Sequence, residues 1–477
     1  MVSHTVIFDY RHNSTKEKKG KLRLRGVMVI IMYKFLCNRM RYYLDKTIQD
    51  ENEVITYADL LRHAEVFGEE LKKQNTSKFG ILCRSNLNTA KALLSCLYAN
   101  KTAVPLSYRY GEKHNEKIID RVGLSHIITE NGIEVISNAV SYPDDKLDDV
   151  ALIMCTSGTT GSPKGAMITS ENMITNVTDI ADYFHVHEGQ RILISRPLYH
   201  CAVLTGEFLL SLIKGLDIVF YDSDFSPINL LHILDNHNIS VMCGTPTMLY
   251  HICTLAKKAY VKPLDVIAVS GECMTRQTAK AIRAAFPKTD IYNVYGLTEA
   301  SPRVSYLPPE LFDEYPLSVG FPLRSLEVKV QNGELLVKGK SIMKGYYNDP
   351  DATNKAIRDG WLHTGDIAEL NEHGMITIKT RRDNMIIRAG MNIYPQEIEN
   401  ALREADKRIV EVMAYGEKRD TAGQKICLKA VVDGLTKSEL FSICKKMLPS
   451  YQLPDMIEIV DEIPKNASGK IIRRALK

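Results

Sequence analysis

Residues 155–165 read Cys-Thr-Ser-Gly-Thr-Thr-Gly-Ser-Pro-Lys-Gly and directly follow the apolar stretch Val-Ala-Leu-Ile-Met at 150–154. The apolar stretch predicts a buried strand, and the glycines after it allow backbone N–H groups to converge on an anion. Hydroxyl groups donate hydrogen bonds to anionic oxygens, and the lysine adds a positive charge. We therefore interpret the segment as a phosphate-binding loop rather than a mobile Gly/Ser linker.

This loop differs from the P-loop of the common nucleotide triphosphatases. That pattern requires Ser or Thr directly after Gly-Lys, whereas Gly165 follows Lys164. A different nucleotide chemistry is therefore indicated.

The composition is that of an ordinary soluble globular protein. The chain has 477 residues, 45% hydrophobic and 25% charged, which is enough for two or more domains. The net charge of +4 is too small to argue for a nucleic-acid partner. No two of the ten cysteines are spaced as Cys-x-x-Cys, so we expect reduced core residues, no zinc site and a cytoplasmic protein.

The first residues permit three interpretations. A basic stretch at 16–25 followed by an apolar one at 26–36 resembles a signal peptide, but Lys34 interrupts it and no small-residue cleavage site follows. The stretch is also far short of a membrane span, and no other segment is long and apolar enough to be an integral membrane segment. We favour a poorly ordered extension over residues 1–31, with Met32 as an alternative start.

The chain that follows predicts an α/β fold. Strands that alternate with helices form parallel sheets with covered faces, and ligands bind at the carboxyl ends of such strands. The loops at 155–165 and 295–299 lie at such ends. Strands are expected at 79–83, 103–106, 150–154, 266–270 and 291–294, and helices at 90–97 and 275–285.

The pattern changes twice in the last third of the chain. From about residue 320, glycines separate short strands such as 334–337 and 375–379, which predicts an antiparallel β subdomain. After Asp383 the order helix, strand, strand, helix predicts a small mobile α+β domain. Its elements are expected at 396–405, at 409–415, at 425–432 and from Thr436, where Glu439 would close a capping box. The expected domains are 32–382 and 383–477.

Two further segments carry polar side chains that suit a nucleotide site. Residues 293–299 read Asn-Val-Tyr-Gly-Leu-Thr-Glu, in which Glu299 is able to hold Mg²⁺ and Thr298 to donate to a phosphate oxygen. Residues 360–366 read Gly-Trp-Leu-His-Thr-Gly-Asp, and a carboxylate placed by a tight turn can accept hydrogen bonds from both ribose hydroxyls. Each segment also has a plain interpretation, a solvated Glu299 and a simple hairpin turn around Asp366.

The end of the chain presents a lysine on a Gly/Ser turn, where residues 464–470 read Pro-Lys-Asn-Ala-Ser-Gly-Lys. Such a lysine is ordinarily only solvated. A functional role for Lys470 is indicated only together with the segments that precede it. Among these is Thr-Arg-Arg-Asp-Asn-Met-Ile-Ile-Arg-Ala-Gly at 380–390, where the domain pattern changes.

Taken in order, five of these segments resemble the adenylate-forming superfamily. That superfamily includes acyl-CoA synthetases, coumarate-type ligases, amino-acid adenylation domains and firefly-type luciferases, and the chain is closest in type to acyl- or aryl-acid thiol ligases. Residues 1–31 have no counterpart, and the part before the phosphate loop is shorter than usual. The matching stretches are 156–165, 293–299, 361–366, 381–399 and 464–470.

The resemblance implies a ligase that works in two steps. A small-molecule carboxylic acid attacks the α-phosphate of ATP, which gives an acyl-adenylate and pyrophosphate. A thiol of coenzyme A or of carrier-protein phosphopantetheine then takes the acyl group. The small domain would rotate between the steps. ATP and Mg²⁺ are the other implied ligands, and a homodimer is one option for the assembly.

The resemblance also assigns residues to the nucleotide. The phosphate loop would hold the β- and γ-phosphates, and the remaining residues would surround the adenosine. The phosphate set is Thr156, Ser157, Gly158, Thr159, Thr160, Gly161 and Lys164. The adenosine set is Gly271, Glu272, Asn293, Tyr295, Gly296, Asp366 and Arg381.

The implied catalytic residues lie on both domains. Glu299 would bind Mg²⁺, and Thr298 would touch the α-phosphate. Lys470 would bridge the carboxylate and the α-phosphate, where charge develops in the first step. Asp383 would be the hinge, and the loop at 388–395 would line the pantetheine tunnel.

The acid is expected to lack an α-amino group. His200-Cys201 stands where amino-acid-activating relatives carry Phe-Asp, and a neutral cysteine cannot balance a buried ammonium group. A fatty, aryl or other simple acid is therefore predicted. His200 would gate the pocket near the carboxylate, although a histidine satisfied within the core is the alternative. The pocket set is His200, Cys201, Thr205, Gly271 and Gly296, with Gly206 beside them.

Two positions depart from the pattern of the superfamily. Thr380 stands where Gly or Asp is usual. Glu272 stands where acyl-CoA synthetases often have a second glycine. Glu272 would either narrow the acyl pocket or lie at the adenine edge.

Two other functions remain open at the level of sequence. A stand-alone adenylation enzyme that loads only a carrier protein would use the same residues. A non-catalytic sensor of nucleotide or acyl-adenylate is the second, but it would have no need of both Lys164 and Lys470.

Overall fold

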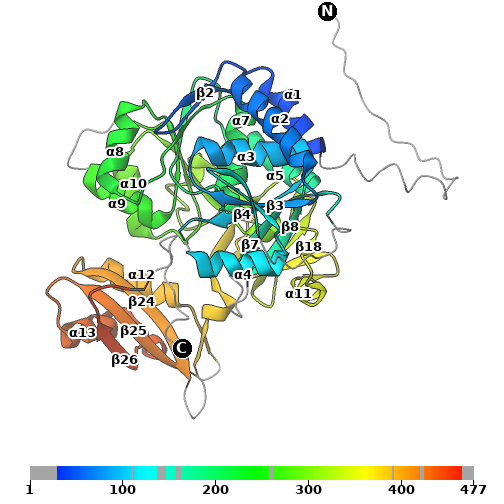
Figure 1. Cartoon of the computed structure of the whole chain (residues 1–477). Helices are drawn as coiled ribbons and strands as arrows, with labels where there is room; N and C mark the ends of the chain where they lie inside the picture. Colours follow the sequence, from blue (N-terminus) through cyan, green and yellow to red (C-terminus); the bar gives the residue numbers. More distant parts are fainter. Residues whose placement is uncertain are drawn as a thin grey trace, which may run out of the picture.

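The computed structural model describes residues 30–109, 111–136, 147–156, 163–256, 263–388, 391–418 and 424–464. These residues form two large mixed sheets with helices between and around them, a smaller antiparallel sheet, and a C-terminal unit with its own sheet (Figure 1). The predicted α/β class, with a β subdomain and a small α+β unit, is confirmed.

The first large sheet has seven strands in the order β18-β8-β7-β4-β3-β5-β6. Its central strands run parallel, and antiparallel strands lie at both edges. The predicted strand at 150–154 is buried throughout, as expected for a strand covered on both faces. The strands are β3 (Lys78–Cys83), β4 (Thr102–Ser107), β5 (His126–Thr129), β6 (Gly132–Val135), β7 (Val150–Thr156), β8 (Lys164–Thr169) and β18 (Gly345–Tyr346).

The second large sheet has nine strands in the order β15-β14-β13-β12-β11-β9-β10-β1-β2. Six neighbouring strands, from β13 to β1 in this order, run parallel. The strands are β1 (Thr47–Gln49), β2 (Val54–Thr56), β9 (Arg191–Ile194), β10 (Asp217–Phe220), β11 (Val241–Gly244), β12 (Val266–Val269), β13 (Asp290–Gly296), β14 (Arg303–Leu307) and β15 (Phe321–Pro322).

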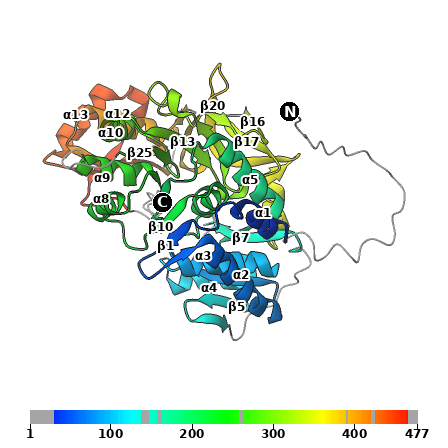
Figure 2. The same ribbon diagram turned by 90° about the horizontal axis from the view of Figure 1, so that it is seen from above.

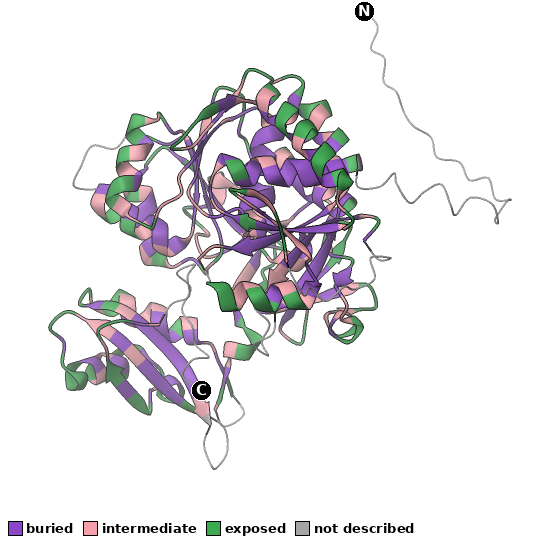
Figure 3. Cartoon of the chain, viewed as in Figure 1, coloured by how far each residue is buried: buried purple, intermediate pink, exposed green. Residues whose placement is uncertain are grey.

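Helices fill the space between these sheets and cover their outer faces (Figures 1 and 2). One hydrophobic core joins side chains of both sheets to α1, α3 and α5, and Figure 3 shows this interior as buried. Separate cores place α8, α9 and α10 on the nine-stranded sheet and α4 on the seven-stranded one. The helices are α1 (Ile30–Met40), α2 (Tyr57–Lys73), α3 (Leu87–Ala99), α4 (Glu112–Val122), α5 (Ser170–Tyr183), α6 (Cys201–Val203), α7 (Leu210–Lys214), α8 (Pro227–Asn236), α9 (Pro246–Ala256) and α10 (Arg276–Ala285).

Helix α1 is the first described element. Its Met32, Leu36 and Met40 are fully buried in the core between the sheets. The structured part of the chain therefore includes Ile30 and Ile31, which the sequence analysis assigned to the extension. Within the described ranges, no helix has the length and apolar character that a membrane span requires.

The β subdomain is antiparallel, as predicted, with the strand order β16-β17-β20-β19 and β21 beside β20. The tight turn that was predicted at Asp366 is not present. Asp366 instead lies inside β20, opposite Arg381 of β21. Strand pairing on both sides of β20 keeps this segment extended, and Gly365 adopts a φ of +72° within it. The elements are β16 (Leu326–Gln331), β17 (Glu334–Gly339), α11 (Pro350–Ala356), β19 (Ile357–Arg358), β20 (Trp361–Leu370) and β21 (Ile376–Arg381).

The C-terminal unit has a hydrophobic core of its own, which includes Ile398, Leu428 and Leu440. Thr436 and Glu439 form the predicted capping box. The unit contains β22 (Ile386–Arg388), β23 (Met391–Ile393), α12 (Pro395–Ala405), β24 (Ile409–Lys418), β25 (Gln424–Val432), α13 (Lys437–Met447) and β26 (Met456–Ile459).

Candidate functional site

The predicted phosphate loop is anchored by two antiparallel strands. Thr156 at the end of β7 lies opposite Lys164 at the start of β8, so both ends of the loop are held together. The Nζ of Lys164 lies 5.2 Å from the centroid of the Tyr346 ring. Six other predicted residues lie outside the described ranges: Ser157, Gly158, Thr159, Thr160, Gly161 and Lys470.

Tyr346 stands between the phosphate loop and Glu299. Its hydroxyl donates a hydrogen bond to Oε1 of Glu299 at 2.7 Å. Thr298 and Glu299 begin the short turn Thr298–Ala300 that follows β13. The backbone N–H of Met343 donates to the carbonyl of Glu299 at 2.8 Å, which ties that turn to the approach to β18. The structure thus brings Lys164 and Glu299 to the same tyrosine, the lysine over its ring and the carboxylate at its hydroxyl.

Tyr346 was not among the predicted site residues. The signal was present in the run Lys-Gly-Tyr-Tyr at 344–347, where two aromatic residues follow a glycine. Burial raises the pKa of the Tyr346 phenol, and the carboxylate of Glu299 raises it further. The phenol therefore remains a proton donor that orients the carboxylate.

Asp366 is enclosed by two of its predicted neighbours. The hydroxyl of Tyr295 donates to Oδ2 at 2.5 Å, and Nη1 of Arg381 lies 3.1 Å from Oδ1. Burial raises the pKa of Asp366, Arg381 opposes the rise, and the negative charge of Glu299 adds to it. Residues of β13 in the nine-stranded sheet and of β20 and β21 in the β subdomain therefore meet at one small polar region.

Asn293 and Glu272 have structural partners. The buried amide of Asn293 donates to the carbonyls of Ser318 and Pro316 at 2.8 and 3.3 Å. These bonds hold the loop that precedes β15 against β13. Oε2 of Glu272 accepts from the hydroxyl of Thr247 at 2.7 Å, in the first turn of α9. The sequence analysis offered no such account of Glu272. The roles of both residues at the adenine remain predictions.

Two predicted glycines have conformations or surroundings that favour glycine. Gly271 follows β12 with a φ of +93°. Gly296 ends β13, where the N–H of Leu297 donates to the carbonyl of Pro302 at 2.9 Å. A Cβ atom on residue 296 would lie 2.1 Å from that carbonyl oxygen. No larger residue fits position 296 unless the backbone moves.

We expect Gly296→Ala to lower the free energy of unfolding by about 1–3 kcal/mol, because overpacking against backbone cannot relax through a side chain. Chemical denaturation measures the change. Gly244→Ala is the matched control, since a Cβ atom there meets only the side chain of Leu249, at 3.0 Å. Equal stability losses in the two variants would contradict the argument.

The segment that was predicted to open an acyl pocket begins a helix with irregular pitch. The carbonyl of His200 accepts from the N–H groups of Val203 and Leu204, both at 2.9 Å. The helix starts as α6, widens to a π-helix over Leu204–Leu209, and continues as α7. Single π turns inside helices often occur at functional sites.

Cys201 stays neutral in this segment. Burial raises the pKa of its thiol to about 12, while contact with Thr205 opposes the rise. The negative charge of Glu299 also acts on this thiol, so Cys201 lies within electrostatic reach of the polar region around Glu299. The roles of His200, Cys201 and Thr205 in an acyl pocket remain predictions.

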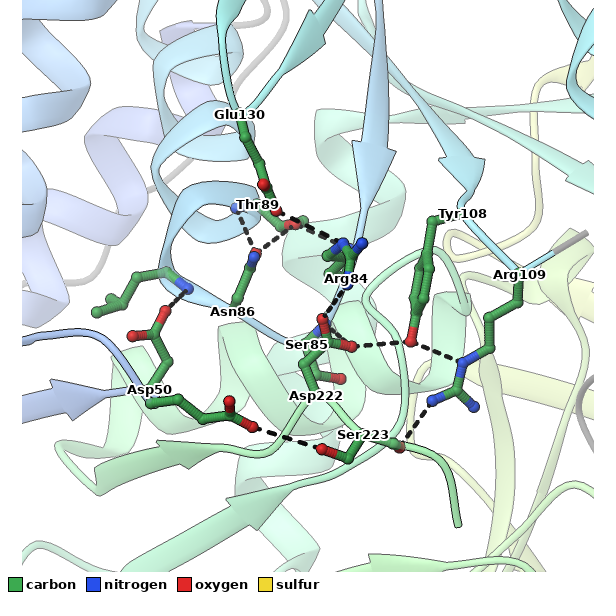
Figure 4. A network of polar contacts seen from close by, with 12 residues as sticks. Asp50, Arg84, Ser85, Asn86, Thr89, Tyr108, Arg109, Glu130, Asp222 and Ser223 are labelled. Atoms are coloured by element: carbon green, nitrogen blue, oxygen red, sulfur yellow. Dashed lines mark hydrogen bonds and ion pairs between the residues drawn. The ribbon is translucent and has the colours of Figure 1, made fainter. Parts of the chain in front are cut away.

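A polar network around Asp222, which was not predicted, contacts the chain just before this segment (Figure 4). Asp222 accepts from Arg84 at 3.1 Å and from the hydroxyl of Tyr108 at 2.9 Å. The carbonyl of Arg84 in turn accepts from the N–H of Leu198. Each of the three polar residues follows an apolar strand (β3, β4 or β10) within two residues, and this repeated position was the available signal.

The predicted hinge residue Asp383 lies in the short turn Arg382–Asn384, between β21 and β22. Arg382 pairs with Glu334 of the β subdomain at 3.0 Å. Arg388, on the other side of the turn, donates to the carbonyl of Leu453 in the C-terminal unit at 2.7 Å. The hinge position thus lies between two residues that are anchored to different parts of the protein.

Comparison with known protein families decides the identity of this fold. The AMP-binding enzyme family matches residues 38–347, and its C-terminal domain matches residues 397–470. The chain belongs to the AMP-binding enzyme family. The predicted resemblance to adenylate-forming enzymes is therefore confirmed.

Several relatives of this AMP-binding enzyme are named CoA ligases. A long-chain-fatty-acid–CoA ligase of Salmonella typhimurium is 33% identical over 355 residues, which cover 70% of this chain and 62% of that ligase. The match thus spans less than two thirds of the length of this Salmonella ligase. A 2-succinylbenzoate–CoA ligase of Bacillus velezensis is 28% identical and is covered to 93%, with 89% of this chain.

A solved structure agrees with this family assignment. The o-succinylbenzoate CoA synthetase MenE from Bacillus subtilis, in complex with its acyl-adenylate intermediate, has a TM-score of 0.81 and is 26% identical. The match covers 93% of this chain and 97% of MenE. ATP-bound MatB from Rhodopseudomonas palustris has a TM-score of 0.83 at 20% identity over 94% and 98% of the two chains, and shows the shared fold.

Proposed function

We propose that this AMP-binding enzyme is an ATP-dependent acid–thiol ligase that acts through an acyl-adenylate. The observation that carries the proposal is the arrangement around Tyr346, which has Lys164 over its ring and Glu299 at its hydroxyl. Asp366 lies close enough to Glu299 for their charges to interact. A cation, a carboxylate for a metal and a carboxylate for a ribose are the groups that a bound ATP requires.

The same residues divide the first step between them. The substrate carboxylate attacks the α-phosphorus, the bond to the pyrophosphate breaks, and acyl-adenylate and pyrophosphate form. Lys164 and the phosphate loop would hold the departing pyrophosphate, while Thr298 would donate to the α-phosphate. Glu299 would hold Mg²⁺, which would neutralise phosphate charge. Lys470 would stabilise the charge that develops between carboxylate and phosphate.

The second step would transfer the acyl group to a thiol. The thiolate sulfur attacks the acyl carbonyl carbon, a thioester forms, and AMP leaves. We propose coenzyme A as the acceptor, because the relatives named above are CoA ligases. The unit that follows the turn Arg382–Asn384 would rotate as a small domain over 383–477 and bring the loop at 388–395 to the site. A carrier protein as acceptor, a homodimer and a cytoplasmic location stay predictions.

The neutral Cys201 supports an acid without an α-amino group. A thiol with a pKa of about 12 offers no negative charge to a substrate ammonium. The named relatives act on long-chain fatty acids, 2-succinylbenzoate and, for a feruloyl-CoA synthase of Amycolatopsis, a feruloyl group. These acids share the reacting carboxylate and differ in the remainder of the molecule.

Acid-dependent exchange of pyrophosphate into ATP tests the first step. We expect exchange with one class among fatty, aryl and dicarboxylic acids, and none with the common amino acids. Robust exchange with an amino acid alone would refute the pocket argument. A thiol-acceptor assay with coenzyme A and with holo carrier proteins then identifies the acceptor. An enzyme that binds ATP but shows no exchange with any acid would favour the sensor alternative.

A further inference from the structure

A buried arginine lies against the helix of the candidate acyl pocket. Arg303 at the start of β14 is only 6% exposed. A Cβ atom on Gly206, in the π-helix, would lie 2.9 Å from Nη2 of Arg303, so the guanidinium group touches this turn of the helix. Asn176 of α5 holds the backbone of Arg303 through hydrogen bonds of 3.1 and 2.8 Å. The position of this charge is therefore set by the core.

Arg303 has no ion pair within 4 Å among the described residues, and its buried Nε lacks a hydrogen-bond partner there. A second arginine lies beside the same helix. Nη2 of Arg196 pairs with Oε1 of the buried Glu207 at 2.5 Å, and Nη1 lies 3.4 Å from the hydroxyl of Ser270. Within the described part of the chain, Oε2 of Glu207 has no hydrogen-bond partner.

The cluster of Arg196, Glu207 and Arg303 has one positive charge in excess. Glu207 neutralises Arg196, which it contacts, and acts on Arg303 only at longer range. Glu272 also acts on Arg196 through its negative charge, but its carboxylate is bound to Thr247. Burial raises the pKa of Glu207, against the effect of both arginines, and a protonated Glu207 would leave the cluster still more positive. A buried charge without a partner is costly, so the site favours an anion supplied from outside the described residues.

The location of the excess charge connects it to the substrate. Gly206 directly follows Thr205 in the helix that begins after His200, and Arg196 lies four residues before His200, in the segment that joins β9 to α6. The cluster therefore lies beside the helix that carries the predicted acyl-pocket residues. An apolar acyl chain would leave Arg303 without a partner, whereas a second carboxylate would pair with it.

We propose that the acid activated by this enzyme carries a second carboxylate, distal to the reacting one, and that Arg303 binds it. The inference rests on the proposed ligase function and specifies its substrate class. Arg303 provides parallel N–H donors that match a carboxylate. Arg196 pairs with Glu207, so this carboxylate does not occupy Arg303.

Pyrophosphate exchange with paired acids tests the proposal. Dicarboxylic acids with aliphatic and aromatic spacers are each compared with their monomethyl ester at the distal end. We expect kcat/KM for the best diacid to exceed that of its ester by on the order of 100-fold or more, because the ester leaves the buried arginine unpaired. Arg303→Met is expected to remove this preference by slowing only the diacid. Arg324→Met, which removes an arginine whose side chain is 76% exposed, is the matched control.

Thermal unfolding of the free enzyme provides a readout that is independent of turnover. Arg303→Met leaves the balanced pair of Arg196 and Glu207, so we expect its Tm to exceed that of the wild type. A diacid should raise the Tm of the wild type but not of this variant. A lower Tm in the variant would show that Arg303 is a structural partner of Glu207 and would overturn the proposal.

The outcomes separate this proposal from the ligase function. Equal exchange with diacids and their esters, unchanged in Arg303→Met, would overturn the second carboxylate and leave the ligase intact. Absence of exchange with every acid would count against the ligase itself. In that case the Tm comparison between wild type and Arg303→Met still decides whether the arginine is an anion site.

Discussion

Asp366→Asn is expected to weaken ATP binding by roughly 100-fold or more. The carboxylate is 5% exposed and is held between Tyr295 and Arg381, so its direction is set before the nucleotide arrives. A hydrogen bond to a charged group contributes about 1.5–3 kcal/mol, and the two ribose hydroxyls would make one each. Loss of the charge at nearly constant shape removes most of this energy. Titration calorimetry with ATP measures the dissociation constant directly.

Asp179→Asn is the matched control for this measurement. Asp179 is also 5% exposed and accepts from the N–H of Ser325 at 3.2 Å, but it lies on α5, away from the nucleotide residues. This variant should bind ATP like the wild type. Tyr295→Phe removes one support of Asp366 and should have a smaller effect than Asp366→Asn. Unaltered ATP affinity in Asp366→Asn would exclude the ribose role.

Lys470→Ala is expected to slow acyl-adenylate formation by on the order of 10³-fold. The loss of one donor that stabilises developing charge typically lowers the rate by 10²–10³-fold, and Lys470 would also supply a full positive charge. The variant should still convert preformed acyl-adenylate and coenzyme A to the thioester at close to the wild-type rate, because the rotated domain would carry Lys470 away in that step. Single-turnover assays of the two half-reactions measure both rates.

Lys445→Ala controls for the loss of a lysine from the same domain. Lys445 is an exposed residue of α13, where its ammonium group lies over the ring of Phe441. Both half-reactions should be unchanged in this variant. Wild-type exchange in Lys470→Ala, or an equal loss in both half-reactions, would contradict the division of labour between the two conformations.

Local sequence patterns predicted most of the fold because they report on local physics. The apolar runs at 150–154 and 266–270 became buried strands, and Thr275 and Thr436 became helix caps. The turn expected at Asp366 was wrong because pairing with strands on both sides outweighed the turn preference of Gly and Asp. Pairing partners that lie up to about 30 residues away leave no local pattern.

The residues of the candidate site likewise fall into those that the sequence pattern predicted and those that it did not. The loop at 155–165, the run that ends in Glu299 and the segment around Asp366 were recognisable because each keeps its chemistry within a few residues. Tyr346, Asp222 and Arg303 were not, since each acts on residues that are distant in sequence. Their contribution depends on which strands lie side by side.

By itself, the sequence determined that this protein resembles the adenylate-forming enzymes and carries a small α+β unit after Asp383. It could do so because five short motifs keep their residue types and their order along the chain. Only the tertiary structure decided that Tyr346 joins Lys164 to Glu299, and that Arg196, Glu207 and Arg303 leave an excess buried charge. Excess charge is a property of a volume from which water is excluded, and that volume exists only after the sheets and helices have packed.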